Sequence, residues 1–285
     1  MQRSPDIQTF LTQILQEDIG RGDITSMAII PDNAQLHAHV VARAPLMLSG
    51  IHLAAMLLAM VDDTLEMKSE AADGVFMPAG TSIMEIKGSA RSILMVERTL
   101  LNVLQHLSGI ATLTAQYVAA IDGLPVRIVD TRKTAPGLRE LQKYAVRCGG
   151  GFNHRIGLDD GVLIKDNHIA VVGNIEGAVA RARAAAPQLI KIEVECDTLD
   201  QVREAVAAKA DMILLDNMDI PTLKAAVALC KASHIASEAS GGITLENVRA
   251  VAETGVDSIA IGALTHSAPA VDIALDSFIP TREAA

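Results

Sequence analysis

The sequence predicts an α/β protein whose larger part, after about residue 108, is a barrel of parallel strands. Two observations predict it. From about residue 125, a short aliphatic run, a polar or glycine-rich turn and an Ala-rich amphipathic helix recur at the spacing that a βαβ crossover needs. Nearly every run also ends in a chemically active side chain, as expected where strand carboxyl ends share the mouth of a barrel.

Six runs rich in β-branched and aliphatic residues predict the strands. They lie at 126–129, 161–164, 190–194, 212–215, 234–237 and 258–261. Helical periodicity between them predicts helices at 174–186, 198–209, 220–232 and 244–254. The polar groups are spread over about six strand ends, whereas an open doubly wound sheet collects them near one switch point. The pattern therefore favours a barrel with fewer than eight strands.

The part before residue 108 predicts an α+β domain. Alternating runs at Leu36–Val41 and Ser82–Ile86 predict strands, and helical patterns lie at both ends. Residues 93–121 predict a helix with a break at Gly109, which links the two parts. Because no low-complexity linker separates them, we expect the domains to pack together.

Composition excludes several classes of protein. A net charge of -10, with two Tyr and no Trp, excludes the basic, aromatic surface of a nucleic-acid binder. Two uncharged stretches, 44–61 and 99–121, approach the length of a membrane span, but each contains several polar residues, so they predict buried helices. Three cysteines at unrelated spacings and the lack of an export signal predict a cytoplasmic protein.

The segment from Arg127 to Lys165 is basic in an otherwise acidic chain, with eight Lys and Arg residues against four acids. Arg132 and Lys133 follow one predicted strand, and Arg155 and Lys165 leave other strand-associated positions toward the same mouth. This gathering predicts a pocket for a small, multiply charged anion. His154 is either a second anion donor or a structural histidine.

Two glycine turns predict a phosphate site. Ser240-Gly241-Gly242 follows one predicted strand and opens a helix, and Gly262 with His266 repeats the arrangement one unit later. Backbone N–H groups in such turns hold phosphate, and the loops after the last two strands of a barrel often form the site. The alternative for each turn alone is simple chain reversal by glycine.

Glu195 and Asp216 follow adjacent strands, and their oxygen atoms suit Mg²⁺ shared with a pyrophosphate. The alternative is that they pair with the basic cluster. We expect Glu193, two residues earlier, to point to the opposite side of its strand. Lys165 also has a second interpretation, because a desolvated lysine in a barrel forms Schiff bases with carbonyl substrates.

These motifs resemble the quinolinate phosphoribosyltransferase family, also called carboxylating nicotinate-nucleotide pyrophosphorylase. The resemblance extends from Gly22-Asp23-Ile24-Thr25 through Glu97–Asn102 and Leu107–Thr112 to Gly255-Val256-Asp257. It implies an N-terminal α+β open-faced sandwich at 1–107, an incomplete TIM-like barrel at 108–268, and a segment at 269–285 that packs back on the sandwich. It also implies a homodimer in which each sandwich caps the partner's barrel.

The resemblance also implies roles for individual residues. Quinolinate would bind to Arg132, His154, Arg155 and Lys165, with Arg98 contributed across the dimer interface. Lys133 would lie beside phosphoribosyl pyrophosphate, Glu195 and Asp216 beside Mg²⁺ and the ribose, and Ser240, Gly241, Gly262 and His266 around the 5′-phosphate. Lys133, Lys165, Glu195 and Asp216 are thereby the expected catalytic residues.

The implied reaction joins the ring nitrogen of quinolinate to the ribose of phosphoribosyl pyrophosphate. Pyrophosphate and CO₂ leave, and nicotinate mononucleotide forms for NAD biosynthesis. Three alternatives stay open: a class I aldolase-type lyase that uses Lys165, a molybdenum-transport-associated relative that acts on another anion, and a non-catalytic anion-binding protein. The intact run Leu163–His168 favours the biosynthetic enzyme over the molybdenum-associated branch.

Overall fold

The computed structural model describes residues 5–69 and 71–277, and the chain divides into two compact units. The first contains the residues up to Thr112 and those from Ala268 onward, and the second contains Leu113–Ser267. The division after Thr112 falls inside helix α4 (Ala90–Ala120), as does the boundary that the sequence predicts at residue 107.

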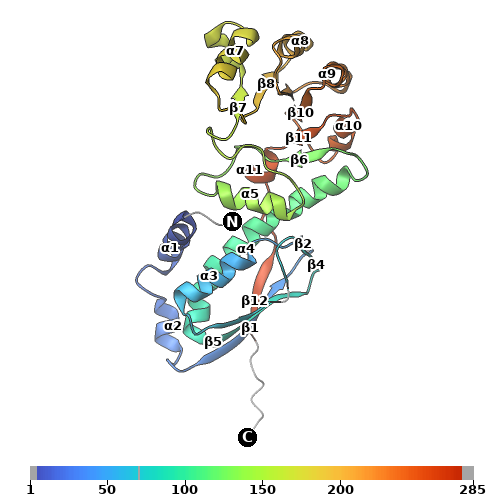
Figure 1. The fold of residues 1–285 in the computed structure, drawn as a ribbon. Helices are drawn as coiled ribbons and strands as arrows, with labels where there is room; N and C mark the ends of the chain where they lie inside the picture. Colours follow the sequence, from blue (N-terminus) through green and yellow to red (C-terminus); the bar gives the residue numbers. More distant parts are fainter. Residues whose placement is uncertain (1–4, 70, 278–285) are drawn as a thin grey trace. The chain divides into compact units, whose positions relative to one another are not determined.

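A four-stranded antiparallel sheet in the order β12-β1-β5-β3 forms the base of the first unit (Figure 1). Its strands are β1 (Gln35–Ala42), β3 (Glu66–Lys68), β5 (Ser82–Ser89) and β12 (Ile273–Ser277). The short strands β2 (Leu46–Met47) and β4 (Phe76–Met77) pair separately. The two alternating runs predicted as strands are thus confirmed as the central pair.

The two faces of this sheet differ, as in an open-faced sandwich. Cross-strand pairs Ala38–Ile86 and Val40–Met84 are buried. The next residues along β1 alternate to the other face, where His37 and His39 lie opposite Lys87 and Glu85. One apolar face and one polar face are typical of an antiparallel sheet covered on one side.

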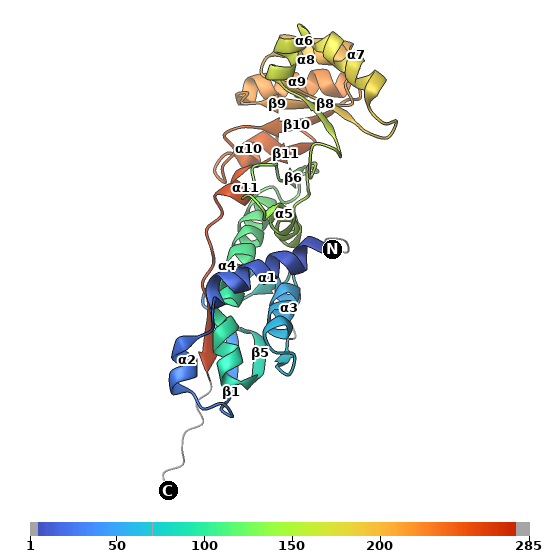
Figure 2. The same ribbon diagram turned by 90° about the vertical axis from the view of Figure 1, so that its left-hand side faces the viewer.

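The first unit also contains α1 (Pro5–Ile19), α2 (Ile24–Ile29), α3 (Ile51–Val61) and α4. Helix α1 lies against α3 (Figure 2). The predicted break at Gly109 is wrong, because α4 continues through that position. A Cβ at Gly109 would overlap the carbonyl oxygen of Pro269, so the glycine permits a close approach of another chain segment rather than a bend.

The C-terminal segment returns to the first unit, where β12 pairs with β1 in the register Val40–Leu275. Gln105 on α4 donates a hydrogen bond to the carbonyl oxygen of Ile273 at 2.7 Å, which ties the segment to the helix. The part of the predicted 269–285 segment that follows Ser277 lies outside the described residues.

Six parallel strands form the sheet of the second unit, in the order β6-β11-β10-β9-β8-β7. They are β6 (Arg127–Val129), β7 (Val162–Ile164), β8 (Ile192–Cys196), β9 (Met212–Asp216), β10 (Ala236–Ser240) and β11 (Ser258–Ala260). All six predicted strands are present. The run predicted at 234–237 forms its strand two to three residues later, which brings Glu238 and Ser240 into β10.

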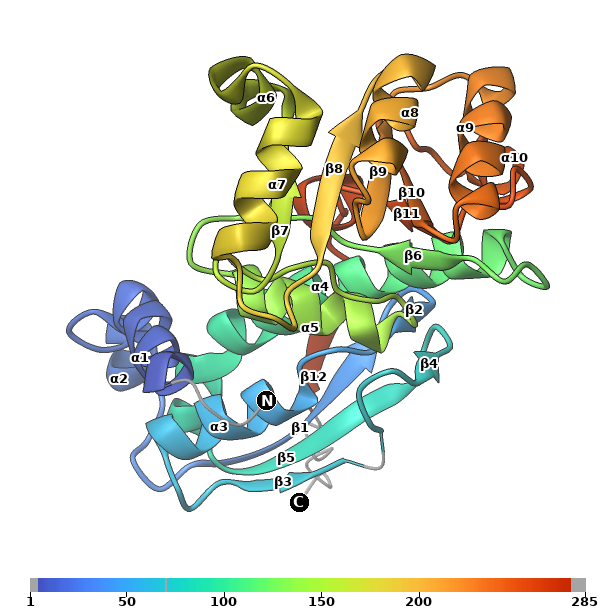
Figure 3. The same ribbon diagram turned by 45° about the horizontal axis from the view of Figure 1, so that its top comes forward.

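Helices α7, α8, α9 and α10 lie side by side along the outer face of this curved sheet (Figure 3). The helices of the second unit are α5 (Arg139–Cys148), α6 (Asp166–Val172), α7 (Ile175–Ala185), α8 (Leu199–Ala207), α9 (Ile220–Ala232), α10 (Val248–Ala252) and α11 (Ala263–His266). Asn174, Thr198 and Asp219 cap α7, α8 and α9 through their side chains, which explains why these helices start where polar residues follow strands.

The barrel is incomplete because β6 and β7 are not paired within the part of the chain that the structure describes. Beside β6 the chain passes as an extended segment, and Phe152 makes an isolated parallel bridge to Val129. The residues that follow, His154 and Arg155, therefore come to the opening of the barrel.

Among residues 5–69 and 71–277, every helix is too short or too polar to span a bilayer.

Candidate active site

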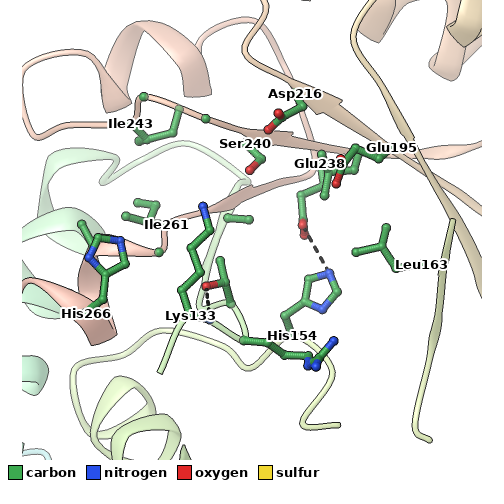
Figure 4. A pocket seen from close by; sticks show the side chains of 18 of the residues that line it. Lys133, His154, Leu163, Glu195, Asp216, Glu238, Ser240, Ile243, Ile261 and His266 are labelled. Atoms are coloured by element: carbon green, nitrogen blue, oxygen red, sulfur yellow. Dashed lines mark hydrogen bonds and ion pairs between the residues drawn. The ribbon is translucent and has the colours of Figure 1, made fainter. Parts of the chain in front are cut away.

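A cavity of about 590 Å³ lies in the second unit at the carboxyl ends of the strands (Figure 4). Lys133 and His154 project toward the ends of β8, β9 and β10. Eleven of the predicted site residues line it: Arg132, Lys133, His154, Arg155, Lys165, Glu195, Asp216, Ser240, Gly241, Gly262 and His266. The twelfth, Arg98, is exposed on α4 in the first unit and does not line this cavity.

A buried ion pair holds the basic segment in place. Asp130 is fully buried after β6, and its carboxylate accepts from Lys143 Nζ, from Asn153 Nδ2 at 2.6 Å and from the His154 backbone N–H at 2.9 Å. Lys143 Nζ also donates to the His154 carbonyl at 3.0 Å. Burial raises the pKa of Asp130, while these partners oppose the shift. The network fixes the segment that carries His154 to the strand end that leads to Arg132.

Two further contacts position the cations after β6. Thr265 donates a hydrogen bond to the Lys133 carbonyl at 2.8 Å, which joins this loop to α11. Gly262 lies close below Lys133, since a Cβ there would come within 3.0 Å of Lys133 Cδ. The Arg132 Nε atom is buried and has no hydrogen-bond partner among the described residues. A buried donor of this kind is suited to an anionic ligand.

His154 has both ring nitrogens engaged by protein groups. Nδ1 accepts the Arg155 backbone N–H at 2.7 Å, and Nε2 lies 3.0 Å from Glu193 Oε2 and 3.5 Å from Glu238 Oε1. Burial lowers the pKa of His154, but the bond to Glu193 and the charge of Glu238 outweigh it and raise the pKa overall. A second proton on Nδ1 would nevertheless face the Arg155 N–H, so the hydrogen bonding fits the neutral ring with its proton on Nε2.

Arg155 extends from the same segment toward the cavity. One guanidinium nitrogen donates to the Gly161 carbonyl at 2.8 Å, just before β7. Burial and the nearby Arg132 charge lower the pKa of Arg155. Two guanidinium groups that repel each other in this way are the arrangement expected for a ligand with more than one negative charge.

Lys165 and Glu195 form an ion pair at the rim, with side chains 44% and 15% exposed. The expectation for Glu193 is wrong. Residues two apart on a strand share a face, so Glu193 points inward like Glu195 and reaches His154.

Asp216 lies at the end of β9, and one of its oxygens accepts from Asn217 Nδ2 at 2.6 Å. Glu195 is on the neighbouring strand β8, and both carboxylates line the cavity. Two carboxylates on neighbouring strands are a donor set that suits Mg²⁺ with water and phosphate oxygens as the remaining ligands.

The two glycine turns differ in construction. After β10, Gly241 and Gly242 have φ of 90° and 62°, and a Cβ on Gly241 would overlap the Asn217 side chain. Helix α10 begins only at Val248, so the predicted helix start at residue 244 is wrong, and a turn intervenes. Gly262, in contrast, directly precedes the single-turn helix α11, which carries His266.

Glu238 was missed by the sequence-based reasoning. It lies on β10 two residues before Ser240 and therefore on the same face, and it lines the cavity. The predicted strand ends at residue 237, so it places Glu238 in the following turn and not on the face of the strand that lines the cavity.

Comparison with known proteins gives the family. The quinolinate phosphoribosyl transferase N-terminal domain matches residues 23–108, and the C-terminal domain matches residues 110–276. The chain is 44% identical over 270 residues to the probable nicotinate-nucleotide pyrophosphorylase [carboxylating] of Bacillus subtilis, covering 95% of this chain and 93% of that protein. A Mycobacterium leprae protein named nicotinate-nucleotide pyrophosphorylase [carboxylating] is 44% identical over 271 residues, covering 93% of this chain and 95% of its own.

A solved structure agrees with this assignment. The nicotinate-nucleotide pyrophosphorylase of Francisella tularensis superposes with a TM-score of 0.91 at 40% identity, covering 97% of this chain and 98% of that one. Both domain profiles, close relatives over nearly the whole length and a matching structure lead to one conclusion: the chain belongs to the quinolinate phosphoribosyltransferase family.

Proposed function

We propose that the protein transfers the phosphoribosyl group of phosphoribosyl pyrophosphate to the ring nitrogen of quinolinate, with loss of CO₂. The products are nicotinate mononucleotide and pyrophosphate, as in de novo NAD biosynthesis. The observation that carries the proposal is that one cavity is lined both by the cations that suit a dicarboxylate and by the glycine turns that suit a phosphate. The names of the relatives support the same reaction.

Quinolinate is the ligand for the cationic part of the cavity. Arg132, Arg155 and Lys165 supply charged donors, and the buried Nε of Arg132 has no hydrogen-bond partner among the described residues. Because both ring nitrogens of His154 bond to protein groups, we assign its ring to the wall that orients the pyridine rather than to a direct ionic contact. Orientation of this kind converts the attack of the ring nitrogen into an effectively unimolecular step.

Phosphoribosyl pyrophosphate fits the opposite part. Ser240, Gly241, Gly262 and His266 surround the proposed 5′-phosphate position, and Lys133 projects into the cavity beside them. Glu195 and Asp216 would hold Mg²⁺, which when bound supplies charge neutralisation to the pyrophosphate. Lys133 adds a fixed positive charge where negative charge grows as the leaving group departs.

Decarboxylation then follows from the charge on the ring. Once the nitrogen is bonded to ribose, its positive charge stabilises the electron pair that remains on carbon 2 when CO₂ leaves. The cations that held the carboxylates keep the ring in place. No covalent bond between protein and substrate is needed for either step.

The lyase alternative is not favoured by the geometry. A Schiff base needs a lysine amine that is free to attack the carbonyl carbon, whereas Lys165 Nζ is paired with the Glu195 side chain. The named relatives are pyrophosphorylases, and they favour neither the molybdenum-transport-associated alternative nor a non-catalytic anion-binding protein.

We also propose a homodimer in which Arg98 of the partner subunit completes the quinolinate pocket. Two observations support it: Arg98 is exposed and does not line the cavity described above, and α2 exposes Ile24, Met27 and Ile29 at 82%, 59% and 73%. Such an apolar group suits an interface. The cytoplasmic location stays a prediction.

The reaction is tested with purified protein, quinolinate labelled in the 2-carboxyl group, phosphoribosyl pyrophosphate and Mg²⁺. We expect labelled CO₂ and nicotinate mononucleotide in equal amounts, and neither product when phosphoribosyl pyrophosphate is omitted. CO₂ release without the nucleotide, or no product at saturating substrates, contradicts the proposal.

The shared site is tested by mixing inactive dimers of Arg98→Ala with inactive dimers of Arg132→Ala. A heterodimer has one site free of both substitutions and random mixing makes half of the dimers heterodimers, so we expect about a quarter of the wild-type activity per chain to return. A mixture that exchanges subunits and stays inactive contradicts a site shared between chains.

A further inference from the structure

The floor of the cavity holds two buried carboxyl groups beside a histidine. Glu193 on β8 and Glu238 on β10 have side chains 8% and 2% exposed, and their oxygens approach His154 Nε2 at 3.0 Å and 3.5 Å. Figure 4 shows Glu238 directed down toward the His154 ring. Glu238 and His154 line the cavity. None of the steps above uses either carboxyl group.

The hydrogen bond to Nδ1 of His154 decides whether the cluster of His154, Glu193 and Glu238 suits a metal ion or a proton. Because Nδ1 accepts the Arg155 N–H, the neutral ring carries its proton on Nε2 and points it at the carboxyl groups. A metal ligand would need a lone pair on Nε2 and a proton on Nδ1. The three groups lie close enough for a cation, but the tautomer favours a proton instead.

Two carboxyl groups share that single ring proton. The shorter contact directs that proton to Glu193. Glu238 Oε2 accepts from Ser258 Oγ at 3.0 Å, while Oε1 is buried without a hydrogen-bond partner among the described residues. Two buried carboxylates this close are not both ionised, so Glu238 is the group that carries a proton.

The charged surroundings of Glu238 agree with this assignment. Burial raises its pKa to about 8, and the charges of Glu193 on β8 and Asp130 after β6 act in the same direction. His154 and the hydroxyl of Ser258 on β11 oppose them. From β9, the residue on this side is the neutral Leu214, which also lines the cavity. Glu238 is thus a neutral acid at pH 7, below a pocket built for a dianion.

We propose that Glu238 is the acid that protonates carbon 2 of the pyridine ring after its carboxylate leaves. This step rests on the function proposed above. The bond between carbon 2 and the carboxylate breaks, CO₂ departs and the electron pair stays on carbon 2. That pair takes the proton of the Glu238 carboxyl group to form the new C–H bond. The resulting Glu238 carboxylate regains a proton from water after the product leaves.

The other groups of the cavity are less suited to this transfer. Arg132 and Arg155 are guanidinium groups that keep their protons. The Lys165 ammonium is held by Glu195 at the rim, and Lys133 is directed toward the phosphate side. Glu238 combines a proton, a position in the cavity wall and an oxygen without a hydrogen-bond partner among the described residues.

The test compares Glu238→Gln with the wild-type enzyme. We expect the kcat for labelled CO₂ release to fall roughly 100-fold or more, the range of general acid catalysis, with the quinolinate Kd changed less than about threefold. The wild-type kcat should fall at alkaline pH as the acid ionises, and this dependence should disappear in Glu238→Gln. Thr254→Val, away from the cavity, is the control that keeps wild-type values. A Glu238→Gln enzyme with wild-type kcat and an unchanged alkaline limb overturns the proposal.

Calorimetry gives a readout that does not depend on turnover. Quinolinate binding is measured near pH 8 in two buffers of different ionisation enthalpy, with thermal melting to confirm that each variant is folded. We expect the wild type to take up a fraction of a proton and Glu238→Gln to take up none. Equal uptake by both proteins overturns the role of Glu238, even if the enzyme is active. Absence of products from the wild type, in contrast, overturns the proposed function and the acid with it.

Discussion

The second unit contains two lysine–carboxylate pairs that differ in burial. Asp130 and Lys143 are 0% and 3% exposed, whereas Lys165 and Glu195 are 44% and 15% exposed. The buried pair is surrounded by further hydrogen bonds to Asn153 and His154. The exposed pair lies where a ligand carboxylate can replace Glu195 beside the lysine.

The difference shows that the same kind of ion pair has two different roles, depending on how deeply it is buried. A buried ion loses its hydration, so removing its partner is strongly destabilising. An exposed ion keeps water, so its pairing contributes little and is readily exchanged. The buried pair is therefore a fixed support, and the pair at the rim of the cavity is a replaceable contact.

The largest effect is expected from breaking the buried pair. Lys143→Met leaves the Asp130 carboxylate without its countercharge and should lower the free energy of unfolding by about 3–5 kcal/mol. Denaturant titration measures it. The double variant Asp130→Asn with Lys143→Met should recover more than half of the loss, because no lone charge remains. If the free energy of unfolding of Lys143→Met lies within about 1 kcal/mol of the wild-type value, the buried pair is no more important for stability than the exposed pair. That result would contradict the comparison.

A smaller effect is expected from the proton on Glu238. Its folded pKa of about 8 lies above the ordinary value of 4.5. The folded state therefore binds the proton more tightly than the unfolded state does. The added stability is fully present below pH 4.5 and is lost as the pH rises to 8. The loss is at most about 1.4 kcal/mol per pH unit. Unfolding of wild type and Glu238→Gln between pH 5.5 and 8.5 should show a steeper loss of stability with pH in the wild type. Parallel curves would mean that Glu238 is not the titrating group.

Thr265→Val should have an intermediate effect on the free energy of unfolding. It removes the hydrogen bond to the Lys133 carbonyl and should cost about 0.5–1.5 kcal/mol. Because Lys133 is then less firmly held, we expect the KM for phosphoribosyl pyrophosphate to rise while that for quinolinate stays constant. Thr254→Val removes a similar bond, to the Val251 carbonyl, away from the cavity. If both variants alter kinetics alike, the effect is general and not one of position.

The smallest stability effect is expected at the rim. Lys165→Met should change the free energy of unfolding by less than about 1 kcal/mol, like Arg203→Met at the exposed pair with Asp200. The two should differ in kinetics, since Lys165→Met should raise the KM for quinolinate roughly tenfold or more, through loss of a charged hydrogen bond. Equal kinetics for the two variants would show that Lys165 does not contact the substrate.

The sequence was most informative where local pattern and chemistry coincide. Polar residues after aliphatic runs predict that Lys133, Lys165, Glu195 and Asp216 face one mouth, and all four line one cavity. This succeeds because parallel strands point their carboxyl ends the same way whatever the details of packing.

Features set by distant contacts were not predictable. Gly109 resembles a helix break, but its cause is Pro269, far along the chain. The exact start of β10 depends on its pairing with β9 and β11. The strand predicted from the sequence lies a few residues too early, so it does not include Glu238. The buried pair of Asp130 and Lys143 likewise depends on the packing of α5, which spacing alone does not reveal.

The opening of the barrel has a consequence for self-association. An unpaired strand edge is a template for another chain, and long, flat, apolar edges invite aggregation. Here both strands that border the opening, β6 and β7, have only three residues. Phe152 bridges to β6, and Lys165 and Asp166 follow β7 directly. The barrel can therefore stay open without offering a neighbouring molecule a strand to extend.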